Sequence, residues 1–124
     1  MGWAAACGDG ASPEARVRAA IDRGEEAAER KDVDALMALV HPEYRDEHGL
    51  DRMRLRYALR SWLANRDAVS ITIVSKELSS RSDEVLATLS MLVEGRTTTM
   101  TLTFREDDGE WKVARARYDS PGGF

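Results

Sequence analysis

The chain has 124 residues, of which 43% are hydrophobic and 32% charged, and its formal net charge is −4. This length indicates one domain, and the composition is typical of globular proteins. Acidic and basic residues are mixed along the chain, which argues against nucleic acid as a partner, because phosphate-binding domains carry a concentrated basic surface. No apolar run reaches the roughly 18 residues of a membrane-spanning helix. The single cysteine excludes an internal disulfide and a multi-cysteine metal site.

The first strong structural signal is a helix start at Ser12-Pro13-Glu14. Serine caps free amides, proline fits the first helical position, and an acid there suits the helix dipole. Small apolar residues then recur at three- and four-residue spacing, with charged residues between them. We therefore predict one amphipathic helix over 13–30 that packs closely against another element.

Two shorter helices and an insert complete the first half. Asp32 can cap a second helix, which Pro42 should end because a proline pushes the preceding residue out of the helical region. Residues 44–49 are predicted to be a short extended piece with a turn. A third helix is expected over about 50–65, with its apolar side chains on one face.

From Val69 the period of the apolar residues changes from near four to two, which is typical of strands. We predict four antiparallel strands, with polar connections at 79–83, 94–96 and 107–109. The third strand has threonines along one face, and Gly109 supplies the positive φ of the last hairpin turn. The last strand is expected over 111–118.

This order of elements resembles the nuclear transport factor 2-like superfamily. The segments that carry the resemblance are Asp34 to Leu39, Pro42 to Tyr44, Gly49 leading into a helix, and Gly109 to Val113. The resemblance implies an α+β cone-shaped barrel, in which three N-terminal helices pack on a curved antiparallel sheet of four long strands and the wide end opens as a pocket. The superfamily includes ketosteroid isomerases, polyketide cyclases, dehydratases and epoxide hydrolases, and also members without a known reaction. It therefore implies a fold and not an activity.

The predicted domain spans 12–119, between a tether at 1–11 and a tail at 120–124. Within the tether, Trp3 to Asp9 resembles the end of a bacterial lipoprotein signal peptide, with small residues before Cys7 and a polar segment after it. This implies lipidation of Cys7 and a periplasmic or cell-surface protein that contacts the membrane only through its lipid. The charged start and most of the apolar region are missing, which a start placed too far downstream would explain. The alternative is an incidental cysteine in a cytoplasmic protein.

Both histidines lie in the insert from His41 to Gly49. Asp46 and His48 are two residues apart on an extended segment and share a face, so Asp46 can orient His48, and either can act as a general base. The alternative is that this segment is a solvated turn and that Tyr44 packs in the core. A metal site built from the two histidines matches no strong ligand motif, so we predict neither a metal nor another cofactor.

Several side chains are candidates to line a pocket, although such residues also form plain cores. They are His41, Tyr44, Tyr57, Trp62, Met91, Phe104, Arg115 and Arg117. The two arginines fall on the predicted inward face of the last strand, which is unusual for charges. Either a β-bulge turns them outward, which we expect, or they reach the pocket mouth and hold an acidic ligand.

The predicted function is binding of a small molecule or peptide in the cone cavity, without demonstrable chemistry. The first alternative is an isomerase, cyclase or dehydratase that uses Asp46 or His48. It is weakened because the active-site acids of ketosteroid isomerases, and an oxyanion-stabilising tyrosine in the first helix, have no counterpart here. The second alternative is a cell-envelope interaction module with a filled cavity and an exposed apolar patch on the sheet. The resemblance also implies a homodimer formed through the outer face of the sheet.

Overall fold

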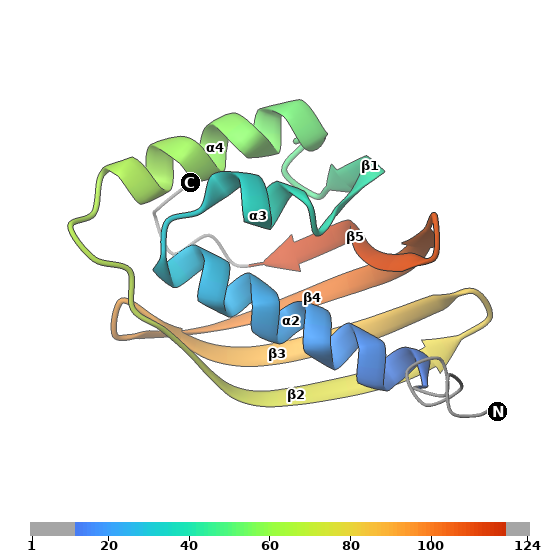
Figure 1. Ribbon diagram of the computed structural model, residues 1–124. Coiled ribbons are helices and arrows are strands. Elements are labelled where there is room, and N and C mark those ends of the chain that lie inside the picture. The colour runs from blue at the N-terminus through green and yellow to red at the C-terminus, as the bar shows by residue number, and fades with distance from the viewer. Residues whose placement is uncertain (1–11, 119–124) are drawn as a thin grey trace, which may run out of the picture.

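The computed structural model describes residues 12–118, in which three helices cover one face of a curved five-stranded sheet (Figure 1). The predicted α+β fold is confirmed. In chain order, the elements are α2 (Pro13–Glu29), α3 (Val33–Met37), β1 (Val40–Asp46), α4 (Arg52–Ala64), β2 (Ile71–Arg81), β3 (Glu84–Val93), β4 (Arg96–Asp107) and β5 (Glu110–Tyr118). None of the helices within this range is long and apolar enough to span a membrane.

Helix α2 follows its sequence signals closely. The Ser12 hydroxyl accepts a hydrogen bond from the Ala15 amide at 3.1 Å, and Pro13 occupies the first turn. Val17, Ala20 and Ile21 are buried against β3 and β4. Because these side chains are small, the helix axis can lie close to the sheet, and α2 crosses its concave face (Figure 1).

The second helix is shorter than predicted, and Pro42 does not end it. Helix α3 stops at Met37, whose carbonyl accepts a hydrogen bond from the Arg52 side chain at 3.0 Å. The chain then becomes strand β1, and Pro42 lies inside that strand. A proline is tolerated there because β1 is an edge strand whose pairing with β5 is irregular between Val40 and Arg45.

The predicted insert is thus a fifth strand, and it changes the sheet from antiparallel to mixed. The strand order is β1-β5-β4-β3-β2, with β1 parallel to β5 and the other pairs antiparallel. The Val113 amide donates to the Leu39 carbonyl at 2.8 Å, which joins the two segments. Because β1 and β2 are both edges, the curved sheet is open and does not close on itself (Figure 1).

The connection predicted at 79–83 is also wrong in extent. Ser79, Ser80 and Arg81 belong to β2 and pair with β3, and the turn contains only Ser82 and Asp83. These strand residues are exposed, so water can solvate their polar side chains. The segment therefore lacks the alternation of apolar and polar residues that usually marks a strand. A polar strand end of this kind resembles a loop when only the sequence is read.

A β-bulge in β5 confirms the expected orientation of the two arginines. Phe104 pairs with Val113 and Thr103 pairs with Arg115, so Ala114 is the extra residue. After the bulge, Ala114, Ala116 and Tyr118 are buried, while Arg115 and Arg117 are exposed on the outer face. The bulge therefore keeps both charges out of the interior.

Candidate functional site

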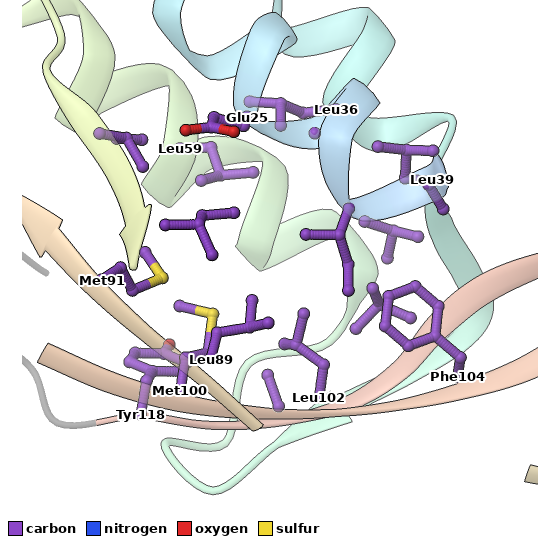
Figure 2. Close-up of a pocket in the computed structure, with 18 of the residues that line it drawn as sticks. Glu25, Leu36, Leu39, Leu59, Leu89, Met91, Met100, Leu102, Phe104 and Tyr118 are labelled. Atoms are coloured by element: carbon purple, nitrogen blue, oxygen red, sulfur yellow. The ribbon is translucent and has the colours of Figure 1, made fainter. Parts of the chain in front are cut away.

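A cavity of about 230 Å³ lies between the helices and the concave face of the sheet. Figure 2 shows its helical side, with Leu36, Leu39 and Leu59, and its sheet side, with Leu89, Met100 and Leu102. Almost every lining side chain is aliphatic or aromatic. The cavity exists because small residues of α2, such as Ala20 and Gly24, face it where a larger side chain would fill the space.

Glu25 is the one charged side chain among the residues that line the cavity. It is half-buried on α2, and Figure 2 shows its carboxylate beside Leu36 and Leu59. As one of the charged residues between the apolar positions of the predicted helix 13–30, Glu25 was expected on the solvent face. Its position in the sequence could have indicated this burial. Glu25 lies four residues after Ile21 and three before Ala28, both buried, and residues at this spacing share one face of a helix.

The other polar groups of the cavity wall are two tyrosines joined through a carboxylate. Tyr44 donates to Asp46 Oδ2 at 2.7 Å, and Tyr118 donates to the same oxygen at 3.2 Å. Both rings are buried and line the cavity, whereas Asp46 does not line it. Strand β1 and the end of β5 are neighbours in the parallel pair, which brings these side chains together.

The hydroxyls of both tyrosines are held in the protonated form. Burial, followed by the hydrogen bond to Asp46, raises the pKa of Tyr44 far above its ordinary value. The pKa of Tyr118 is also raised, first by burial and then by the nearby negative charge of Asp46. Each hydroxyl is therefore a fixed donor to the carboxylate rather than a proton source for a ligand.

The second oxygen of Asp46 organises the turn that follows β1. Oδ1 accepts the backbone amides of His48 at 2.9 Å and Leu50 at 3.0 Å. Gly49 in this turn has φ +80°, a conformation that glycine adopts without strain. The turn leads to Asp51, which caps α4 through the Arg54 amide at 2.9 Å, and this bond lowers the pKa of Asp51. Asp46 thus contacts the backbone of His48 and not its imidazole.

A protein-family comparison matches residues 4–120 of the sequence to the C-terminal domain of the low molecular weight antigen MTB12. The chain belongs to this MTB12 C-terminal domain family. No curated protein sequence matches it.

Solved structures confirm that this MTB12-family chain has the nuclear transport factor 2-like fold. An NTF2-like protein from Cytophaga hutchinsonii superposes with a TM-score of 0.73 at 15% identity, covering 89% of this chain and 99% of that one. A proposed dehydratase of the NTF2-like family from Streptomyces avermitilis has a TM-score of 0.67 at 21% identity, covering 83% and 91%. A proposed aromatic ring hydroxylase from Novosphingobium aromaticivorans has a TM-score of 0.71 at 14% identity, covering 86% and 87%. At these identities the likeness establishes the fold alone.

The candidate catalytic residues of the MTB12-family chain lie beside the cavity rather than in it. His48 is exposed, its ring lies 4.7 Å from that of Tyr118, and its Nε2 is 3.3 Å from the Tyr118 carbonyl oxygen. Both oxygens of Asp46 are engaged by the donors described above. Neither residue is among those that line the cavity.

Of the eight candidate pocket residues, the structure places Tyr44, Met91 and Phe104 in the cavity wall. His41 is buried, and its Nδ1 accepts the Glu43 amide at 3.0 Å. Trp62 is buried in a separate cluster with Leu63 and Val69, with the Arg66 guanidinium 4.0 Å from its ring. Tyr57 is 60% exposed. These three side chains do not line the cavity.

Arg115 and Arg117 lie in a different depression, on the outer face of the sheet, beside Thr101, Thr103 and Glu47. Arg115 pairs with Glu84 at 3.4 Å, and Arg117 pairs with Glu47 at 3.5 Å. The Arg115 and Arg117 side chains are 64% and 80% exposed, so these ion pairs add little stability. Within residues 12–118, no group of three or more His, Cys, Asp or Glu side chains is placed to hold a metal ion.

Proposed function

We propose that the protein binds a small, mainly apolar molecule in the cavity between α2 and the sheet. The observation that carries this proposal is an apolar cavity of about 230 Å³ in which Glu25 is the single charged lining residue. Ligand sites are typically apolar concavities with a few polar groups, and drug-sized ligands occupy about 300–1,000 Å³. The ligand is therefore smaller than a typical drug molecule.

The packing around the cavity supports the same proposal. Apolar side chains that border unfilled space lose contact energy, because no atoms pack against them on that side. A domain has a net stability of only about 5–15 kcal/mol. A ligand that fills the cavity would restore much of the missing contact energy, and its binding would stabilise the folded state.

The two alternative functions receive less support from the geometry. An enzyme that uses Asp46 or His48 requires one of them to face the cavity, and neither lines it. An interaction module requires a filled interior and a broad apolar patch on the sheet. The exposed large hydrophobic residues are instead divided between α4, with Met53 and Tyr57, and the sheet, with Val74 and Leu92.

Titration with 1-hexanol, followed by two-dimensional NMR, tests the proposal. We expect saturable shifts at residues that line the cavity. Leu59→Trp places an indole into the cavity wall and should abolish them, whereas Leu92→Trp, on the exposed face of β3, should leave them unchanged. Shifts that do not saturate, or that persist in Leu59→Trp, would contradict binding at this site.

We propose further that the protein is exported and anchored through a lipid on Cys7, which lies outside the described residues. The support is the sequence from Trp3 to Asp9, in which small residues precede the cysteine and a polar segment follows it. Cells that produce the protein should incorporate an alkyne-labelled fatty acid into it and retain it in the membrane fraction. Cys7→Ser should lose both the label and the membrane association; label retained in Cys7→Ser would disprove attachment at this residue.

A further inference from the structure

We infer that the ligand carries a hydrogen-bond donor, with a protonated amine as the best group, and that Glu25 binds this group. By the same inference, the pocket rejects carboxylates. This inference rests on the proposed binding function and specifies its ligand class. It follows from the hydrogen-bonding capacity of the polar groups at the cavity wall and from the charges near it.

The Glu25 carboxylate is available to a ligand. The neighbouring acids of α2 have partners elsewhere, since Asp22 binds Lys76 at 2.8 Å and Glu26 lies 3.4 Å from Arg30. Among residues 12–118, no hydrogen bond or ion pair is found for Glu25. Its carboxylate lies beside the aliphatic side chains of Leu36 and Leu59 (Figure 2), where partial exclusion of water strengthens a bond to a cationic donor.

The remaining polar groups of the wall can only accept hydrogen bonds. A tyrosine hydroxyl has one proton, and Tyr44 and Tyr118 both direct theirs to Asp46. The other side chains that line the cavity are all apolar, and no lysine, arginine or histidine is among them. A ligand carboxylate would thus enter without a donor to replace its water, which disfavours its binding.

A second negative charge lies directly behind the wall. Asp46 accepts its four hydrogen bonds from two tyrosine hydroxyls and two backbone amides, all of which are neutral. Within the described part of the chain it has no ion pair. Because the apolar interior screens charge weakly, Asp46 and Glu25 both favour a cation in the cavity and oppose an anion.

Three ligands with the same chain length and different charges test the inference: hexylamine, 1-hexanol and hexanoate, each titrated by NMR at neutral pH. A charge-assisted hydrogen bond contributes about 1.5–3 kcal/mol, so hexylamine should bind at least about tenfold more tightly than hexanoate. Hexanol should fall between them. Glu25→Gln should remove the preference for the amine while preserving binding of hexanol.

Glu26→Gln is the matched control, because it makes the same charge change on the same helix at an exposed position outside the cavity. It should retain the full amine preference. Equal binding of the three ligands, or a preference that survives in Glu25→Gln, would overturn the inference and leave the pocket function intact. If none of the three binds to wild-type protein that is folded by circular dichroism, both proposals fail.

Discussion

At the scale of single residues, Asp46 joins the cavity wall to the turn before α4. Its two oxygens receive hydrogen bonds from two tyrosines and two backbone amides. Tyr44 is buried, so loss of this carboxylate would leave its hydroxyl group without its acceptor and away from water. The geometry therefore indicates that the Asp46 carboxylate holds the tyrosine hydroxyls and the turn in place. Its contribution can be measured as a change in the free energy of unfolding.

We predict that Asp46→Ala lowers the free energy of unfolding by about 2–4 kcal/mol, because it removes the acceptor of the buried Tyr44 hydroxyl together with that of three further donors. Urea denaturation followed by circular dichroism measures the change. Asp22→Ala removes an exposed ion pair with Lys76 and should cost less than about 1 kcal/mol. If Asp46→Ala and Asp22→Ala lower the free energy of unfolding by similar amounts, the hydrogen bonds of Asp46 contribute no more stability than an exposed ion pair, which would contradict the prediction.

The same region shows how much of the site the sequence can predict. The segment from His41 to Gly49 was chosen because it concentrates histidines and acids, and it does border the cavity through Tyr44. Composition alone could not reveal that Asp46 bonds to Tyr118, because that contact depends on the pairing of β1 with the distant β5. Glu25 was missed because a charge on an amphipathic helix is ordinarily assigned to solvent.

At the scale of elements, predictions succeeded where the signal was local. The start of α2, the position of α4 and the turns at Gly95 and Gly109 all depend on neighbouring residues, and all are confirmed. An extended piece was predicted at 44–49, but its start at Val40 and its pairing in the sheet were not. Within residues 12–118 its strand partner is β5, which lies about seventy residues later in the chain, and Pro42 hides its strand character. A bulge in the last strand was expected because a regular strand would have placed two arginines on its inward face, and the structure places that bulge at Ala114.

At the scale of the whole molecule, the two faces of the curved sheet differ in what packs against them. The concave face holds α2 and the cavity, while the outer face is open to solvent over β2, β3 and β4 (Figure 1). The outer face carries the threonine row of β4 together with the exposed side chains of Val74 and Leu92. Because none of the described helices covers this face, it is accessible to a second copy of the chain (Figure 1).

We propose that two copies of the chain associate through this outer face. A stable interface buries about 800 Å² on each partner, and a cation placed among its buried apolar side chains should weaken the dimer by at least about tenfold. Leu92→Lys is therefore expected to shift the protein towards monomer in sedimentation-velocity experiments. Met53→Lys makes the same kind of change on the exposed side of α4 and should leave the sedimentation coefficient unchanged. A wild-type protein that sediments as a monomer at the highest soluble concentration, or a dimer that Leu92→Lys does not weaken, would disprove association through this face.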